Sequence, residues 1–384
     1  FVSGPAPVID AITAARLPPL PMPSPHFQKL PGPFRFHRGG EIPEVVLAYE
    51  TWGELSPARD NVLFLTTGLS PGSHARSSVE DPTPGWWEEM IGPGRPIDTE
   101  RFFVICNNSI GSCHGSTGPS SIDPRTGEPY RMSFPALSLE DIAASSRELL
   151  RSLGITRVNT VMGCSLGGMT ALAYAVLFPD EVDQVVSISA ATSASPFAIA
   201  FRTLQREAIR TDPNWMEGTY PVDHPPRRGM ALARKLGVIS YRSAQEWAQR
   251  FDRKRVPNPQ PPAIEFEIEA YLQGHADRFV TRFDANSYLY LSKAMDLFDL
   301  AEYGAGSVEE ASRKILAKRA LVIGVESDIL FPVSQQEELA RALGAGGRDV
   351  TFHRFPSIQG HDSFLIDLAR FGPAVAAFFE GQST

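Results

Sequence analysis

The sequence predicts an α/β protein in which helices cover both faces of a central sheet and one long helical segment interrupts the alternation. Short, continuously apolar runs at 45–53, 61–68 and 102–108 indicate strands. Strands that are buried on both faces have this composition, whereas a sheet with one wet face would alternate apolar and polar residues. A further strand, helix and strand follow at 159–190, and the alternation resumes from Ile315 after a long region without strands.

The regular pattern begins only after a proline-rich start. Residues 17–25 read LPPLPMPSP, and this density of proline disfavours helices and central strands. We therefore expect residues 1–40 to form an irregular, extended arm on the surface and the α/β core to begin at residue 41.

A helix is expected to begin after Ser138, because Ser138 and Asp141 have the spacing of a capping box. Leucine and isoleucine then recur on one stripe until Gly154, where this helix would end. The strand at 159–165, a helix that runs to residue 178 and the strand at 182–190 complete a βαβ unit.

Residues 193–311 differ in character from the rest of the chain. They show helical periodicity, more charge and the proline-rich run VPNPQPPA at 256–263, without a convincing strand. We interpret this segment as a helical lid inserted between core strands. The predicted domains are an arm at 1–40, an α/β core at 41–192 and 312–384, and the lid at 193–311.

The octet VMGCSLGG places Ser165 in a Gly-x-Ser-x-Gly pattern directly after a strand and before a helix. This is the layout of a nucleophile elbow, in which glycine at 163 and 167 leaves room for a strained turn that lifts the serine hydroxyl above the sheet. The chain contains 31 glycines, so the pattern by itself also arises by chance.

Asp328 and His361 supply the two other members of a catalytic triad in the right order. Asp328 follows the apolar run ALVIGVES at 320–327, and His361 follows the extended run VTFHRFPS at 350–357. A single aspartate after a strand is usually a turn or capping residue. The order serine, acid, histidine, with each residue after a predicted strand, is that of the α/β-hydrolase fold and favours the catalytic interpretation.

Charge and cysteine content exclude several other classes of protein. The 36 lysines and arginines against 44 aspartates and glutamates give a net charge of −8 without a basic run, which argues against nucleic acid as a partner. The three cysteines form neither a disulfide framework nor a Cys-x-x-Cys pair, and the histidines lack metal-ligand spacing. No stretch reaches the roughly 20 apolar residues of a membrane span, and residues 1–16 do not resemble a signal peptide. We therefore expect a cytoplasmic protein that binds neither metal nor membrane.

Five segments in order resemble the homoserine O-acyltransferase family of the α/β-hydrolase fold: CHGSTGPSSIDPRTGEPY at 113–130, GCSLGGMTALAYA at 163–175, RFDANSYLYLSKAMDLFD at 282–299, ESDILFP at 326–332 and GHDSFLID at 360–367. The similarity runs from about Phe36 to the C-terminus. Two further segments, LQREAIRTDPNW at 204–215 and RKLGVISYRSAQEW at 234–247, most resemble the branch that acylates L-serine, the serine O-succinyltransferases.

The resemblance implies a ping-pong reaction in which Ser165 takes an acyl group from acyl-coenzyme A and passes it to the hydroxyl of an amino acid. His361 would act as general base, and Asp328 would orient it. The backbone N–H groups of Leu69 and Leu166 would form the oxyanion hole. Succinyl-CoA or acetyl-CoA is the expected cosubstrate, and no tightly bound cofactor is expected.

The resemblance also implies residues that bind the acceptor amino acid. Arg234, assisted by Tyr241, would bind the α-carboxylate, and Asp362 would bind the α-ammonium. Each has an ordinary alternative: a solvated helix residue for Arg234, a packing role for Tyr241 and a helix cap for Asp362.

A succinyl donor carries a second carboxylate, which calls for a further cation near the acyl group. Arg202 and Arg206, on the first helix of the expected lid, are the candidates. Both could instead form surface ion pairs with Glu207 or Asp212.

Three functions remain open at this stage. The first is an acyl-CoA:L-serine O-acyltransferase with succinyl as the preferred group, serving cysteine biosynthesis. The second is the same chemistry on homoserine with acetyl or succinyl, serving methionine biosynthesis; the acceptors differ by one methylene, a discrimination of about 1–3 kcal/mol. The third is an esterase or thioesterase, in which water takes the acyl group. The resemblance further implies a homodimer formed through the helical insertion.

Overall fold

The computed structural model describes residues 26–257, 259 and 264–381. The first 25 residues of the expected arm lie outside the described part of the chain, and so does most of the proline-rich run at 256–263.

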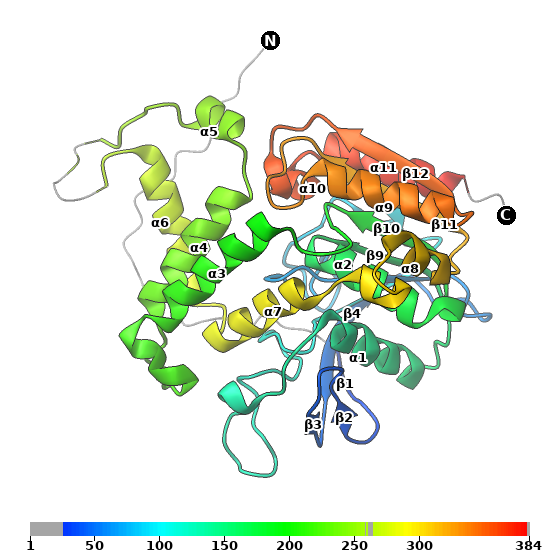
Figure 1. The fold of residues 1–384 in the computed structure, drawn as a ribbon, viewed down its shortest axis with the longest axis horizontal. Coiled ribbons are helices and arrows are strands. Elements are labelled where there is room, and N and C mark those ends of the chain that lie inside the picture. Colours follow the sequence, from blue (N-terminus) through cyan, green and yellow to red (C-terminus); the bar gives the residue numbers. More distant parts are fainter. Residues whose placement is uncertain (1–25, 258, 260–263, 382–384) are drawn as a thin grey trace.

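An eight-stranded sheet forms the centre of the protein (Figure 1), in the order β1-β4-β8-β5-β9-β10-β11-β12. From β8 onward all neighbours are parallel, and β4 is antiparallel to both β1 and β8. This arrangement confirms the predicted fold class. The strands are β1 (His26–Lys29), β4 (Val46–Trp52), β5 (Val62–Thr66), β8 (Phe103–Asn107), β9 (Val158–Cys164), β10 (Val182–Ile188), β11 (Arg319–Val325) and β12 (Asp349–Phe355).

The expectation of an irregular arm is wrong for the end of that segment. β1 pairs with the edge of β4, with His26 opposite Tyr49, and β2 (Phe34–Arg35) pairs with β3 (Glu41–Ile42). Such strands are too short to show a period of two, and β1 depends on the hydrogen-bonding edge that β4 offers. A second small pair is formed by β6 (Ile91–Gly92) and β7 (Ile97–Asp98).

Helices cover both faces of the sheet. On one face the side chains of Phe64, Ile105 and Val161 join a core with α1 (Leu139–Ser152), α2 (Leu166–Leu177), α8 (Val308–Lys314) and α9 (Val333–Ala345). On the other face Leu65 and Met162 pack with α11 (Leu368–Glu380), which follows the short helix α10 (Ser363–Ile366). Alternate strand residues thus enter two different cores, which explains the continuously apolar strand sequences.

The start of α1 follows the predicted capping pattern. The Ser138 backbone N–H and its Oγ both donate to Asp141 Oδ2, each at 2.8 Å. This arrangement satisfies groups that the first turn of a helix leaves without partners.

Between β10 and β11 the regular elements of the described chain are helical, as Figure 1 shows. In that view α3, α4 and α6 stand together beside the sheet, and α7 runs back towards it. The α-helices of this insertion that precede α8 are α3 (Pro196–Arg210), α4 (Arg227–Ser240), α5 (Ala244–Arg250), α6 (Glu267–Val280) and α7 (Ala285–Leu297). Two 3-10 turns belong to this insertion, η3 (Pro213–Gly218) and η4 (Leu300–Gly304). The other 3-10 turns of the described chain lie outside it: η1 (Arg131–Ser133), η2 (Pro179–Glu181) and η5 (Gly360–Asp362).

Among the described residues, no helix combines the length and the apolar character needed to cross a bilayer.

Candidate active site

Ser165 occupies a strained turn between β9 and α2. Its backbone has φ 57° and ψ −125°, a conformation that a non-glycine residue adopts at a cost of about 1–3 kcal/mol. The two neighbouring glycines make the turn possible. A Cβ on Gly163 would lie 2.2 Å from Thr66 Oγ1, and one on Gly167 would lie 2.4 Å from the Thr66 carbonyl oxygen. The turn therefore requires the Gly-x-Ser-x-Gly pattern that the sequence contains.

The structure brings the three predicted triad residues into one chain of hydrogen bonds. Ser165 Oγ lies 2.8 Å from His361 Nε2, and His361 Nδ1 lies 2.7 Å from Asp328 Oδ2. The three residues follow β9, β12 and β11, which are parallel, so all three lie at the carboxyl-end edge of the sheet. This geometry suits transfer of the serine proton to the imidazole.

Asp328 is held on both of its oxygens. Oδ1 accepts hydrogen bonds from the backbone N–H groups of Leu330 at 2.9 Å and Phe331 at 3.0 Å, while Oδ2 faces His361. Only 3% of the Asp328 surface is exposed. The carboxylate is therefore fixed in one orientation, with one oxygen reserved for the histidine.

The imidazole of His361 is buried between aromatic rings. The ring stacks on Phe331 at 5.1 Å and meets the edge of Phe364 at 5.7 Å. Burial alone would lower the pKa of His361, but the charge of Asp328 and its hydrogen bond outweigh burial, so the pKa is raised. A basic imidazole whose cation is stabilised is what a general base beside a serine needs.

A cavity of about 250 Å³ opens above Ser165. Its wall comes from the end of β5 and the segment after it, the elbow, the residue that follows α4, the loop after β12, and helix α10. The lining residues are Thr66, Gly68, Leu69, Ser70, Pro71, Trp86, Cys164, Ser165, Tyr241, His361, Asp362, Phe364 and Leu365. Burial raises the pKa of the Cys164 thiol well above its usual value, so this cysteine is uncharged beside the nucleophile.

The two predicted oxyanion donors flank Ser165. Leu166 is the first residue of α2, directly after the nucleophile, and Leu69 lines the cavity from the loop after β5. Within the described chain, neither backbone N–H donates to a protein acceptor. Both groups are therefore uncommitted within the described chain, and their role as oxyanion donors stays a prediction.

Asp362 and Tyr241 both line this cavity, and Arg242, which does not line it, pairs with Asp362. Arg242 Nε donates to Asp362 Oδ2 at 3.1 Å, and the Asp362 N–H donates to the Tyr241 carbonyl at 3.1 Å. Burial raises the pKa of Asp362, and the nearby positive charges of Arg242, His361 and Arg234 oppose that rise. The sequence contained no signal for Arg242 except its position next to Tyr241.

Gly360 explains how the histidine loop meets the helical insertion. Its φ is 65°, and a Cβ there would lie 2.7 Å from the Tyr241 carbonyl oxygen. Only glycine permits both this backbone conformation and this close approach. The loop that carries His361 therefore packs directly against the residues at 241–242.

Arg234 lies outside the cavity at Ser165 and lines an adjacent pocket. Its Cζ is 4.7 Å from the centre of the Phe279 ring and 5.9 Å from that of Tyr241. Its Nε is buried and has no hydrogen-bond partner among the described residues.

Arg202 and Arg206 are buried, which excludes the alternative of surface ion pairs with Glu207 or Asp212. Only 5% of each is exposed, and both bind one carboxylate of α7. Arg202 Nε lies 2.6 Å from Asp296 Oδ1, and Arg206 Nη2 lies 2.7 Å from Asp296 Oδ2. One buried carboxylate thus faces two cations, and Arg202 Nη2 lacks a partner within the described chain.

His74 belongs to a buried polar cluster that the sequence did not reveal. Its Nδ1 lies 2.8 Å from Glu50 Oε2 on β4, and its Nε2 lies 2.8 Å from the Thr83 carbonyl oxygen. Burial would lower the pKa of His74, but the bonds to Glu50 and Thr83 and the charges of Glu50 and Asp81 outweigh it, so the pKa is raised. Burial in turn raises the pKa of Glu50. The cluster ties the segment that follows Leu69 to β4.

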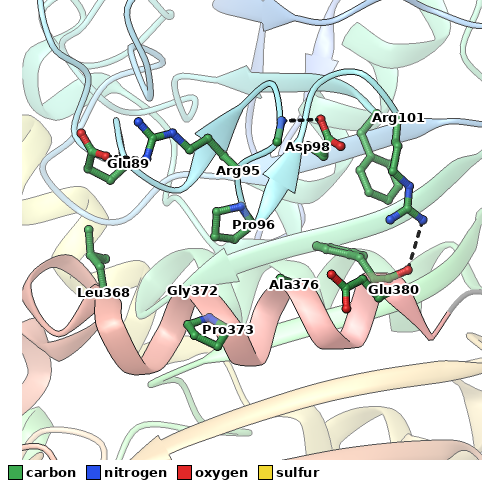
Figure 2. A pocket seen from close by; sticks show the side chains of 13 residues that line it. Glu89, Arg95, Pro96, Asp98, Arg101, Leu368, Gly372, Pro373, Ala376 and Glu380 are labelled. Atoms are coloured by element: carbon green, nitrogen blue, oxygen red, sulfur yellow. Dashed lines mark hydrogen bonds and ion pairs between the residues drawn. The ribbon is translucent and has the colours of Figure 1, made fainter.

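A separate hollow of about 650 Å³ lies between α11 and the segment at 89–102. Figure 2 shows the side chains that line it. It shares no lining residue with the cavity at Ser165. Two of its charged groups are paired within its own wall: Arg95 with Glu89 at 2.8 Å, and Arg101 with the Phe379 carbonyl at 3.2 Å. Within the described chain there is also no group of three or more His, Cys, Asp or Glu side chains that would hold a metal ion.

The sheet order and the Ser165–His361–Asp328 chain of hydrogen bonds define an α/β hydrolase in the structural sense. A family model of the alpha/beta hydrolase fold matches residues 62–366. The serine O-succinyltransferase of Litchfieldella anticariensis is 58% identical over 361 residues, which cover 93% of this chain and 98% of that protein. The L-serine/homoserine O-acetyltransferase of Streptomyces lavendulae is 53% identical, over 93% of this chain and 97% of that protein.

Solved structures agree with this assignment. The homoserine O-acetyltransferase from Bacillus anthracis superposes with a TM-score of 0.85 at 30% identity, covering 92% of this chain and 97% of that chain. Esterase E22 superposes with a TM-score of 0.82 at 28% identity, covering 92% and 100%. The chain belongs to the homoserine and serine O-acyltransferase family of the α/β-hydrolase fold.

Proposed function

We propose that this protein is an acyl-CoA-dependent O-acyltransferase that transfers a succinyl group to L-serine. The observation that carries the proposal is the chain of hydrogen bonds from Ser165 through His361 to Asp328 at the cavity that opens above Ser165, in a protein 58% identical to a serine O-succinyltransferase. Coenzyme A takes part as a cosubstrate and leaves after the first half of the reaction.

In the first half-reaction, Ser165 Oγ attacks the thioester carbonyl carbon while His361 Nε2 takes the hydroxyl proton. The C–S bond then breaks, and the leaving thiolate takes the proton from the His361 imidazolium. The products are an acyl ester on Ser165 and free coenzyme A. Asp328 orients the imidazole and stabilises the transient imidazolium, because its Oδ2 lies 2.7 Å from His361 Nδ1.

In the second half-reaction, His361 Nε2 removes the proton of the acceptor hydroxyl, whose oxygen attacks the acyl carbon. The Ser165 ester bond breaks, and Ser165 takes the proton back from His361. In both halves the tetrahedral oxyanion would accept hydrogen bonds from the N–H groups of Leu69 and Leu166. One such donor typically contributes about 10² to 10³ in rate.

For the acceptor, we assign the α-ammonium to Asp362 and the α-carboxylate to Arg234 with Tyr241. Asp362 faces the cavity beside His361, and its pairing with Arg242 fixes the carboxylate in place. Arg234 would reach the acceptor from the adjacent pocket, across the Tyr241 ring.

For the succinyl carboxylate, Arg202 is the better of the two predicted cations. It shares Asp296 with Arg206, so the pair carries a net positive charge, and its Nη2 is buried without a partner among the described residues. The positive charge of Arg202 is felt at both His361 and Tyr241, because it acts to lower the pKa of each of these two groups. Arg206 already donates to Ser292 and Thr203 and serves mainly to hold the cluster.

The test is thiol release from succinyl-CoA and acetyl-CoA, each with L-serine, L-homoserine or no acceptor, with products identified by mass. We expect the fastest release with succinyl-CoA and L-serine. A preference for homoserine or for acetyl-CoA would support the second candidate, which the 53% identity to an L-serine/homoserine O-acetyltransferase favours. Equal release without any acceptor would mean hydrolysis and would refute the transferase proposal.

A further inference from the structure

A second pocket of about 230 Å³ adjoins the cavity at Ser165, and the two share Ser70 in their walls. Three arginines and two histidines surround it, together with Phe279 and Phe283. Arg234 comes from α4, Arg278 from α6, and Arg282 from the turn after α6. We call it the basic pocket.

The three arginines of the basic pocket have no carboxylate within ion-pair distance among the described residues. This contrasts with Arg242, which is paired with Asp362 and Glu246. The nearest acid on α6, Asp277, accepts a hydrogen bond from Gln273 instead. Three arginines without an acidic partner among the described residues surround one hollow, which makes it a site of concentrated positive charge.

The same positive charge affects the pKa of His275. Burial and the positive charges of Arg278 and Arg234 lower its pKa to about 4. The imidazole is therefore neutral near pH 7. It adds a polar group to the wall of the pocket without repelling the arginines.

The floor of the basic pocket is apolar and fixed. Phe279 and Phe283 stack at 5.2 Å, His114 packs on Phe283 at 5.4 Å, and His114 Nε2 hydrogen-bonds to the Ser70 carbonyl oxygen at 3.1 Å. Arg278 and Arg282 are exposed at the rim. A ligand suited to this pocket has an uncharged arm that lies on the aromatic floor and an anionic end at the rim.

We propose that the basic pocket binds the phosphates of the acyl-coenzyme A donor through Arg278 and Arg282, and that the uncharged arm of the donor passes Ser70 to present its thioester to Ser165. This inference rests on the proposed function. Each guanidinium can donate two parallel hydrogen bonds to a phosphate, and the two arginines together suit a diphosphate better than a single carboxylate. Arg234 lies between the proposed donor site in the basic pocket and the proposed acceptor site at Tyr241.

The first test compares a phosphate-bearing donor with one that lacks phosphate. The double variant Arg278→Gln/Arg282→Gln is assayed with succinyl-CoA and with S-succinyl-N-acetylcysteamine, at fixed L-serine. We expect kcat/KM for succinyl-CoA to fall about 10- to 100-fold, mainly through KM, and kcat/KM for the truncated donor to change less than about twofold. Arg313→Gln, which removes an exposed arginine paired with Glu310 on α8, is the matched control and should behave as the native protein.

The second test measures binding without turnover. Calorimetry of the native protein with coenzyme A, pantetheine and inorganic pyrophosphate should show coenzyme A binding much more tightly than pantetheine. The double variant should lose that difference, and the affinity of the native protein for coenzyme A should fall as salt is raised. Arg278→Lys/Arg282→Lys, which keeps the charge, should recover part of the affinity.

Two results would overturn the inference. One is an equal fall of kcat/KM for both donors, which would mean that the arginines support the fold or the acceptor site; the other is equal binding of pantetheine and coenzyme A by the native protein. Failure of the proposed function would look different. The native protein would then bind coenzyme A without releasing thiol from succinyl-CoA, and the calorimetric comparison would still decide the role of the pocket.

Discussion

Asp328→Asn tests the triad most sharply, because the structure dictates how an amide must sit there. The Oδ1 position accepts two backbone N–H groups, from Leu330 and Phe331, so the amide oxygen of the asparagine must take that position. The amide NH₂ then faces His361 Nδ1. The opposite orientation would set the NH₂ against two donors and would lose two hydrogen bonds, each worth about 1 kcal/mol.

With an NH₂ group at that position, His361 Nδ1 must accept a hydrogen bond from the amide, so the ring proton of the neutral imidazole is on Nε2 instead of Nδ1. Nε2 then donates to Ser165 Oγ and no longer accepts its proton. We expect kcat to fall about 10⁴-fold, or about 5 kcal/mol of transition-state free energy, with the fold retained.

The assay is thiol release from succinyl-CoA with saturating L-serine, together with thermal unfolding of each variant. Asp299→Asn is the matched control, because Asp299 also accepts a backbone N–H, from Ala301 at 2.9 Å, and lies outside the cavity. If Asp328→Asn kept more than about a tenth of the native kcat, Asp328 would not orient His361 and the reasoning would fail.

The other predictions concern the nucleophile, its turn, the buried histidine and the assembly. Ser165→Ala should lower turnover by a factor on the order of 10⁶, and retention of more than a few per cent in the thiol assay would exclude the covalent route. Gly167→Ala places a Cβ 2.4 Å from the Thr66 carbonyl oxygen and should lower the free energy of unfolding by about 1–3 kcal/mol in urea titration; an unchanged midpoint would contradict the geometry. Because the folded-state pKa of His74 is raised, its contribution to stability is present below the unfolded pKa of about 6.5 and is lost as pH rises through the folded pKa. His74→Gln should therefore flatten the fall of stability as pH rises above the unfolded pKa of about 6.5, and an identical pH profile would rule out this role. The protein should sediment as a homodimer at micromolar concentration, and monomer alone would refute that expectation.

Much of the fold could be read from local patterns. Continuous apolar runs marked the parallel strands because burial on two faces leaves no room for alternation, as at β5 and β9. The Ser138–Asp141 pair marked the start of α1 because capping acts over three residues. The edge strand β1 was not predicted, because its four residues are too few to show the alternation of apolar and polar residues that is typical of a strand. β1 forms by pairing with β4, which is a separate segment of the chain.

The candidate site likewise contains residues that the sequence predicts and residues that it does not. Ser165, Asp328 and His361 could be predicted because each follows a strand of one sheet, and parallel strands end at one edge. Arg242 and Glu50 could not be predicted, because their importance comes from contacts with Asp362 and His74, which lie 120 and 24 residues away along the chain.

The sequence by itself determined the strand-turn-helix at Ser165, because glycines at 163 and 167 are required within five residues of chain. It also determined the order of the acid and the histidine that follow. Only the tertiary structure decided which cations are free. Arg202 and Arg206 share one buried aspartate, whereas Arg234, Arg278 and Arg282 have no acidic partner among the described residues. The reason is physical: pairing of a charge depends on which distant side chains folding places within about 4 Å, and one-dimensional spacing does not encode that distance.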